Sequence, residues 1–463
     1  MKKLFSHINS LNNEKGVALI VVLMVLVVIS ILGISLLGLA STNVKMSSGD
    51  RDTQSAYYVA ESGITYRMNI IESKLKESYS LAVTSSDFFT RMNNAMELGV
   101  VKDYTGFDTT SGNKPVASTT IEQIPSSTSI SYSYDYKITS LGKINNRTRK
   151  VVKIFHLSWK PRTSVTIPAD TVLFVKDSLV LKNVPVDGSV GTSATMSEVT
   201  LNGSKAIVTG NIYTNVSTPL NIPEFPAFSI TTSNNYSFTS TTQTLTMNTD
   251  MAFNTLTVNS GQTLTIDVGN YNKNLVLNNL NVYGKIKVVG TGKLSFYLKN
   301  LDMGSGSIIG TEGNILGTDS NIEKIYVFLE GTPTKINGKI YGSIYAKNPL
   351  NEIIVIDPAK GKGVLGHIID AGINTGTTIG VSYLSNDNTV PKMIYAPNAS
   401  VSINTSFSGS IIARSLTSSG NDDNFIFKFV QINYDNSPLF VDNGTGLSPV
   451  KDSITTEPTR ESN

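Results

Sequence analysis

One unbroken apolar stretch near the start of the chain limits its possible folds more than any other feature. Val17–Ala40 reads VALIVVLMVLVVISILGISLLGLA and contains no charged residue. About 20 apolar residues in a helix are enough to cross the hydrocarbon layer of a membrane. Lys2, Lys3 and Lys15 precede the stretch, and positive residues favour the cytoplasmic side. The sequence therefore predicts a single-pass membrane protein with a cytoplasmic N-terminus and extracellular C-terminal domains.

Three interpretations of this stretch compete. The first is a plain membrane anchor. The second is a secretory signal peptide, with the small residues at Gly38–Ala40 as its cleavage site, but the apolar part of a signal peptide spans only about 7–15 residues. The third follows from a resemblance. Lys15 and Gly16 stand directly ahead of the apolar run, and AYYVAESGI follows at Ala56–Ile64. Together these segments resemble the PilX-type minor pilins and related type IV pilin-like proteins.

This resemblance implies a processing step and exposes a departure from the family pattern. It implies cleavage by a prepilin peptidase between Gly16 and Val17. Major pilins usually begin with Phe or Met and carry Glu at the fifth mature position, where this chain has Val21. A carboxylate in lipid needs a partner, which in pilins is the N-terminal amine of a neighbouring subunit. Because Val21 cannot form that pair, the resemblance implies a minor or tip subunit.

The composition excludes several classes of function. The chain has no cysteine, so disulfides and thiolate metal sites are not available to it. Its net charge of +3 comes without a basic cluster, which argues against a nucleic-acid partner. Its three histidines, His7, His156 and His367, lack the spacing of metal ligands. We therefore expect no cofactor and no metal. The length of 463 residues predicts more than one domain.

The segment after the apolar run predicts a pilin-like head. Residues 1–16 form the leader, and residues 17–80 are expected to form one long helix that is transmembrane in its first half. Its second half carries apolar residues at intervals of three and four, the helical period; these are Tyr57, Ala60, Ile64, Met68, Ile71 and Leu75. Residues 81–162 predict an α/β head with a helix near Ser86–Leu98 and a β-hairpin around Gly142–Asn146. His156 is then a strand residue.

Residues 163–443 predict an all-β domain built from internal repeats. Ile336–Lys347 (INGKIYGSIYAK) aligns without gaps with Ile403–Arg414 (INTSFSGSIIAR), and Val208–Asn215 is a shorter copy. One such unit cannot bury its own apolar face, but stacked units form a continuous core. We therefore expect a parallel β-helix or β-solenoid, with Asn ladders along its axis and a β-sandwich as the alternative. Residues 444–463, rich in Ser, Thr, Pro and charge, predict a disordered tail.

The repeats predict which residues shape each coil. Gly210, Gly342 and Gly409 occupy one position of the repeat, where a bend or close packing is expected to exclude a Cβ. Their neighbours Ile344 and Ile411 are expected to point into the core, whereas Ser343 and Ser410 are expected to face outward and to tolerate substitution. Tyr213, Tyr345 and Tyr395 would be candidate ligand-binding residues on an exposed face, but such residues more often lie in or beside the core.

The solenoid region offers little sign of catalysis. β-Helices can host polysaccharide-acting enzymes, which need clustered acids. Here the candidate acids are scattered along the sequence, at Asp267, Asp302, Asp370 and Asp387. The one adjacent pair of acids in the region is Asp422–Asp423. No nucleophile elbow, phosphate-binding loop or zinc-protease motif is present. Segments MIYAPNASVSI and GSIIARS resemble C-terminal domains that follow PilX-type segments in Firmicutes surface proteins. We expect a non-enzymatic protein.

The sequence as a whole predicts a minor, or tip, pilin-like subunit of a type IV pilus or related secretion filament. It would display the solenoid for surface interaction or adhesion, with a surface glycan or protein as ligand. Its expected partners are the membrane, other pilins, the pilus assembly machinery and the prepilin peptidase. One alternative is a single-pass, membrane-anchored adhesin-like protein outside any filament. The other is a β-helical enzyme that acts on polysaccharides.

Overall fold

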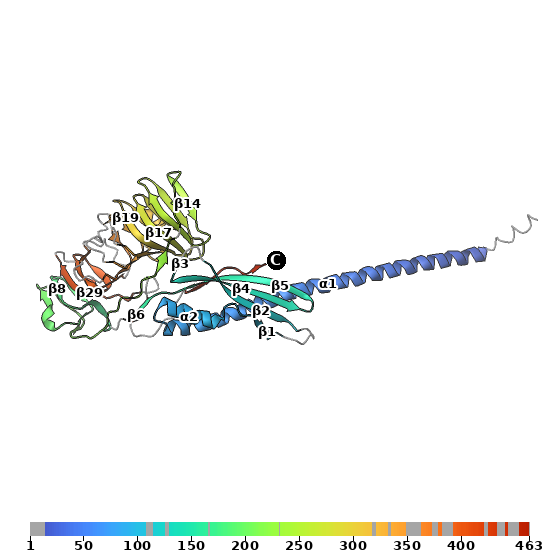
Figure 1. Cartoon of the computed structure of the whole chain (residues 1–463), viewed down its shortest axis with the longest axis horizontal. Coiled ribbons are helices and arrows are strands. Elements are labelled where there is room, and N and C mark those ends of the chain that lie inside the picture. Colours follow the sequence, from blue (N-terminus) through green and yellow to red (C-terminus); the bar gives the residue numbers. More distant parts are fainter. Residues whose placement is uncertain are drawn as a thin grey trace, which may run out of the picture.

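The chain folds into a long N-terminal helix, an α/β head and a β-solenoid (Figure 1). This computed structural model describes residues 14–107, 114–125, 129–164, 167–230, 232–316, 321–331, 335–348, 363–372, 378–381, 392–420, 425–432, 440–442 and 453–462. The predicted order of parts along the chain, with a long apolar helix followed by a large region of parallel sheets, is confirmed.

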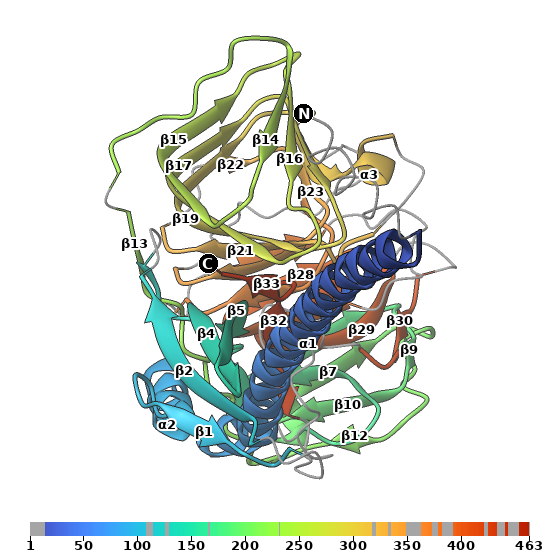
Figure 2. The ribbon, with the colours of Figure 1, turned by 90° about the vertical axis from the view of Figure 1, so that its right-hand side faces the viewer.

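Helix α1 spans Glu14–Leu81 and has two halves with different surroundings. The first half projects from the molecule as a rod, and the second half lies across the head sheet (Figures 1 and 2). The stripe expected from the helical period packs on that sheet, with Ala60, Ile64 and Ile71 almost completely buried. Gly142 of the sheet lies so close to the backbone of Ala56 and Ala60 that a Cβ would not fit between them. The helix and sheet therefore form one tightly packed unit.

The head is an antiparallel sheet with one further helix, as predicted. Helix α2 spans Ser85–Met96, and the sheet runs in the order β1 (Lys102–Tyr104), β2 (Val116–Ile124), β4 (Ser133–Ile144) and β5 (Arg147–Ser158). Strands β4 and β5 form the expected hairpin. Asn145 in its turn has φ of 50°, a left-handed conformation that Asn tolerates better than most residues. A buried cluster that includes Ile121, Tyr136 and Phe155 joins the sheet to α1.

The C-terminal segment corrects one expectation. Its composition predicts disorder over residues 444–463, but β32 (Ile454–Thr456) and β33 (Arg460–Glu461) pair antiparallel with β5. The prediction is wrong for residues 453–462, because backbone pairing with the open edge of β5 orders this segment without an apolar pattern. The C-terminal strands therefore form one edge of the head sheet. The solenoid is an insertion in the sequence between β5 and β32.

The solenoid consists of parallel strands stacked coil upon coil. Strands β15 (Met251–Val258), β17 (Lys273–Val282), β19 (Leu294–Met303), β21 (Ile325–Leu329), β24 (Ser343–Ala346), β26 (Ile368–Asp370), β28 (Lys392–Ile403) and β29 (Phe407–Ser419) pair in succession. A second sheet contains β14 (Thr242–Thr246), β16 (Thr263–Asp267), β18 (Lys285–Val289), β20 (Ile308–Thr311), β23 (Lys339–Ile340) and β25 (Gly363–Val364). Since these pairings are parallel, the structure supports the solenoid over the β-sandwich.

The chain does not wind through the stack in one direction. Its first solenoid strand, β7 (Thr171–Val175), pairs with β10 (Ser189–Thr192) on one side and with the late strand β29 on the other. Strand β10 in turn pairs with β12 (Ile212–Tyr213). The chain thus winds outward from β7, crosses to the other end before β14, and winds back until β29 meets β7.

Short elements complete the coils and connections. They are β3 (Ser129–Ile130), β6 (Arg162–Ser164), β8 (Leu179–Lys182), β9 (Val186–Asp187), the 3-10 helix η2 (Met196–Glu198), β11 (Val199–Asn202), β13 (Phe228–Ser229), α3 (Glu312–Leu316), β22 (Lys335–Ile336), β27 (Thr378–Val381), β30 (Phe427–Lys428) and β31 (Phe440–Asp442). The β3–β13 pair connects the head to the segment that crosses the solenoid.

Equivalent positions in successive coils line the solenoid core. One continuous row of paired residues contains Leu173, Ile411, Ile394, Ile368, Ile344, Val327, Phe296 and Leu275. All of these residues are buried in one apolar cluster. Burying such a side chain contributes about 1.5–3 kcal/mol relative to leaving it exposed. Asn side chains also stack as expected, with Asn278 donating to Asn254 at 2.9 Å and Asn254 to Asn235 at 3.1 Å.

Candidate assembly helix and head–solenoid junction

The first half of α1 has the properties of a membrane-spanning helix. In the part of the chain that the structure describes, it contains the one candidate span, with a mean hydropathy of 3.2 over its most apolar window and none of that window buried. The large apolar side chains from Leu19 to Leu39 are all exposed. The hydroxyls of Ser30 and Ser35 donate to the carbonyls four residues earlier, at 2.7 and 2.9 Å. These bonds give each hydroxyl an acceptor within the helix, which the hydrocarbon layer of a membrane does not offer.

The predicted processing residues lie at the start of this helix. Gly16 and Val17 are within the first turns of α1, which begins at Glu14, and residues 1–13 of the predicted leader lie outside the described residues. Val21 follows one turn later and is 53% exposed. Its side chain is a branched hydrocarbon, so this part of the helix surface carries no carboxylate. Gly33 and Gly38 have open space around them, which permits close approach of another helix.

A crossing segment, residues 220–230, lies between the head and the solenoid; we call it the strap. The carboxylate of Glu224 accepts hydrogen bonds from the amide and hydroxyl of Ser85 at 2.8 and 3.0 Å, at the start of α2. Tyr132 of the head donates to the Glu224 carbonyl. On the solenoid side, Tyr345 donates to the carbonyl of Pro223, and Tyr395 donates to that of Asn221 at 2.6 Å. The strap is therefore bonded to both parts.

The strap determines the environment of the tyrosines that the sequence offered as ligand-binding candidates. Tyr345 and Tyr395 are fully buried, so neither belongs to an exposed binding face. Phe225 of the strap packs edge-on against Tyr345, with ring centroids 5.2 Å apart. Tyr213 lies at the end of the stack in β12 and is half-buried. The outer face of this sheet is thus an internal junction for most of its length.

The sequence predicts that Ser343 and Ser410 are exposed to solvent, and this prediction is wrong. Ser343 and Ser410 point away from the core as predicted, yet they are 0% and 4% exposed. Their face of the sheet is covered rather than open to solvent. The Ser343 hydroxyl accepts from the amide of His367 at 3.0 Å, and the Ser410 hydroxyl donates to the carbonyl of Thr171 at 3.2 Å. Ile344 and Ile411 do point into the core.

The three repeat glycines lie where a side chain does not fit. A Cβ on Gly409 would collide with the carbonyl of Lys392, and its φ of 124° is unfavourable for residues with a side chain. A Cβ on Gly342 would collide with the carbonyl of Ile325. Gly210 lies against the backbone of Gly188. Each glycine thus permits close packing on the preceding coil.

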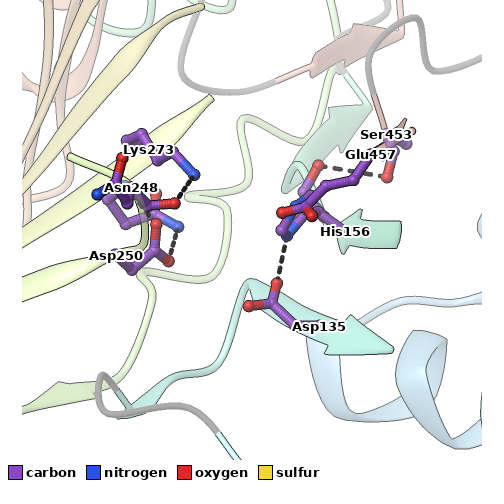
Figure 3. Close-up of polar contacts among 9 residues, drawn as sticks. Asp135, His156, Asn248, Asp250, Lys273, Ser453 and Glu457 are labelled. Atoms are coloured by element: carbon purple, nitrogen blue, oxygen red, sulfur yellow. Dashed lines mark hydrogen bonds and ion pairs between the residues drawn. The ribbon is translucent and has the colours of Figure 1, made fainter. Parts of the chain in front are cut away.

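A polar cluster of Asp135, His156 and Glu457 links the head to the C-terminal segment, and a separate polar group on the solenoid lies beside it (Figure 3). His156 Nδ1 lies 2.6 Å from Asp135 Oδ1, and its Nε2 lies 3.8 Å from Glu457 Oε1. Burial by itself lowers the pKa of His156, but the hydrogen bond and charge of Asp135 outweigh it, and the net pKa is raised. On the solenoid side, burial raises the pKa of Asp250, which accepts two hydrogen bonds from Asn274 at 2.8 Å.

The sequence identified His156 as a strand residue but not its two neighbours. Asp135 lies across the hairpin in β4, and Glu457 belongs to a segment predicted to be disordered. The register of the hairpin could have revealed Asp135, which is paired with His156. No local pattern indicates Glu457. The described residues contain no group of three or more His, Asp or Glu side chains arranged to hold a metal ion.

The acids considered for catalysis have separate structural contacts. Asp267 accepts from the amide of Gly269 at 2.9 Å, and Asp370 from that of Gly372 at 2.8 Å, so each stabilises a turn. Asp302 accepts from the hydroxyl of Tyr283 at 2.6 Å. The remaining candidates, Asp387 and the pair Asp422–Asp423, lie outside the described residues.

One comparison with known proteins matches a large part of α1. The PilX N-terminal family model matches residues 15–65. No curated protein matches the chain. Among solved structures, the competence-associated pilin ComZ from Thermus thermophilus is 10% identical over 89% of this chain and 98% of its own, with a TM-score of 0.22. The family match covers the apolar half of α1 and the start of its head-packed half. The N-terminal region of this chain is therefore type IV pilin-like.

Proposed function

We propose that this protein is a minor subunit of a type IV pilus or a related secretion filament. The observation that carries the proposal is the coincidence of the PilX N-terminal match, residues 15–65, with a helix whose apolar half is exposed and whose second half is fixed to a head. Such a helix can lie in a membrane before assembly and pack against other pilin helices afterwards. Other pilins and the assembly machinery are then its partners.

Processing is the first step of this proposal. A prepilin peptidase cleaves between Gly16 and Val17, which leaves a free amine on Val17 at the membrane surface. Val21 stands where major pilins carry the glutamate that pairs with a neighbour's amine. A subunit at the tip has no subunit beyond it whose amine must be neutralised, so this substitution favours a tip or sparse position.

Display is the second part of the proposal. The N-terminus faces the cytoplasm before processing, and the head and solenoid are extracellular. The strap, with its bonds to α2 and to Tyr395, supports a rigid connection between the two. A rigid solenoid on an anchored head suits adhesion to a surface glycan or protein. The separate structural contacts of Asp267, Asp302 and Asp370 favour display over catalysis.

The processing step can be tested by mass spectrometry of the mature N-terminus. We expect a peptide that begins at Val17 when the protein is isolated from cells that contain a prepilin peptidase. Gly16→Leu should block this cleavage, and Asn13→Leu serves as the matched control outside the cleaved bond. An intact leader in the wild type would instead favour a single-pass anchored protein, and a start near Ser41 would indicate a signal peptide.

A further inference from the structure

Basic residues gather at the end of the head that lies nearest the membrane-capable half of α1. The turn of the β4–β5 hairpin points along α1 toward its projecting part (Figure 1). Asn145 in this turn donates to Asp52 of α1 at 3.1 Å. The guanidinium of Arg147 lies against Gly49. The hairpin end is therefore held at residues 49–52 of the helix.

We call the exposed cations at this end the basic tip: Lys143 and Arg147 from the hairpin, with Lys45 and Arg51 from α1. Among the described residues, none of these four side chains has an ion pair. Fewer acids lie nearby. The carboxylate of Glu461 is paired with Arg149 at 3.1 Å, so Asp50 and Asp52 of α1 are the two carboxylates that oppose these four cations. The tip therefore carries a net positive charge.

The length of α1 places this tip close to the membrane surface. A helix rises 1.5 Å per residue, so Gly49 lies about 14 Å beyond Ala40, the last residue of the apolar stretch. The headgroup layer occupies about 5–8 Å of that distance. The remaining gap is comparable to the length of an arginine side chain and to the Debye length of about 8 Å at physiological ionic strength. Charges on the tip and on lipid headgroups are then close enough to interact.

Apolar side chains accompany the cations. Val44 and Met46 of α1 are 69% and 63% exposed, and Leu141 of β4 is 43% exposed. Exposed apolar residues next to lysine and arginine are typical of surfaces that lie against the headgroup region of a membrane. A soluble polyanion would be bound by the cations alone and would leave these side chains unexplained.

We propose that the basic tip binds the anionic lipid headgroups of the membrane that α1 crosses. Before assembly, this contact fixes the orientation of the head relative to the bilayer. The contact is broken when the subunit leaves the membrane and enters a filament. This inference rests on the membrane placement in the proposed function. It adds a lipid-recognition surface to the head, away from the apolar helix itself.

The test uses the full chain reconstituted in vesicles. Because the protein has no cysteine, Asn146→Cys provides a single fluorescent label at the hairpin turn, and Ser204→Cys provides a control label on the solenoid. Quenching by a headgroup-attached quencher is compared between vesicles of zwitterionic lipid and vesicles that also contain anionic lipid. We expect quenching at position 146 to rise at least twofold with anionic lipid and to fall again at high salt. Position 204 should not change.

Charge-reversal variants show whether the cations bind anionic lipid or whether position 146 merely lies near the bilayer. Lys143→Glu with Arg147→Glu should abolish the dependence on anionic lipid, whereas the matched solenoid pair Lys182→Glu with Lys299→Glu should leave it unchanged. Equal quenching at position 146 in both kinds of vesicle would overturn the proposal. Vesicle flotation then shows whether that result contradicts the membrane placement of the chain or only the role of the basic tip. A chain that does not float with the vesicles contradicts the membrane placement as well, and a chain that floats without the lipid dependence contradicts the basic tip alone.

Discussion

Leu173, in the first strand of the solenoid, pairs directly with Ile411 in the late strand β29. The two ends of the inserted domain are thus neighbours in the middle of the stack. Both side chains are completely buried in the same core cluster. This contact joins the coils formed by the first part of the domain to those formed by its last part, so the two sets of coils stabilise each other.

Ile411→Ala should destabilise the whole domain. Removing a buried isoleucine side chain to Ala costs about 2–5 kcal/mol, because it loses contacts and leaves a cavity. Thr417→Ala on the exposed side of the same strand is the matched control and should change stability by about 0.5 kcal/mol or less. Denaturant unfolding of the purified chain measures both. Equal effects from the two substitutions would show that the β7–β29 contact does not support the fold.

Gly409→Ala should be more damaging than an alanine at an open glycine. Gly306 also has a positive φ, of 77°, but nothing lies near its missing Cβ. Gly306→Ala should therefore cost about 1 kcal/mol from backbone conformation alone. Gly409→Ala adds a collision with the carbonyl of Lys392, so its cost should be clearly larger. Thermal melting compares the two variants, and a Gly409→Ala variant that melts at or above Gly306→Ala would contradict the packing described.

Acid should weaken the solenoid through His367. Burial, with smaller contributions from Lys160 and Lys392, lowers the pKa of His367 from 6.5 to about 4. The backbone amide of Met393 donates to its Nδ1 at 3.0 Å, which requires the neutral ring. Because the unfolded chain binds the proton more readily, this stability is present above about pH 6.5 and is lost as the pH falls toward 4.

The size of this effect follows from the shift in pKa. It corresponds to at most about 3 kcal/mol. Unfolding free energies measured between about pH 7 and pH 4 should show the loss, and His367→Ala should remove that part of the pH dependence while lowering stability throughout. A wild type and variant with the same pH dependence would contradict the assignment.

The His156 contact should respond to pH in the opposite sense. Its pKa is raised by Asp135, so the stability it contributes is present below its unfolded pKa of about 6.5 and is lost as the pH rises through the folded value. Glu457, Asp250 and Lys273 also face this group. Asp135→Asn should lower the pKa of His156 because burial then dominates.

Titration of the imidazole by NMR measures this change, with Asp103→Asn on the exposed edge strand as the control. Hydrogen exchange at the amide of Glu457, which donates to the carbonyl of Ile154, should quicken in Asp135→Asn as the C-terminal strand loosens. An unchanged pKa of His156 would show that Asp135 does not govern it.

Features that depend on local pattern could be predicted from the sequence. The inward positions of Ile344 and Ile411 follow from alternation along a strand, and the crowded glycines follow from the gapless repeat. The stripe through Ile64 and Ile71 follows from the helical period. In each case the residues that decide the structure lie within a few positions of one another.

Features that depend on distant segments could not be predicted. Ser343 and Ser410 have the predicted direction but not the predicted exposure, because the head and strap cover their face. The pairing of residues 454–461 with β5 depends on the open edge of another part of the chain. Glu457 comes near His156 only through that pairing, so the polar cluster has no signal in the order of residues.

The account depends most on the claim that this chain enters a filament as a sparse subunit. Filaments sheared from cells and quantified by mass spectrometry test it directly. The account predicts that the fraction contains this chain, beginning at Val17, at a small fraction of the amount of the main pilin. Recovery of the chain with membranes alone, or at an amount equal to the main pilin, would contradict it.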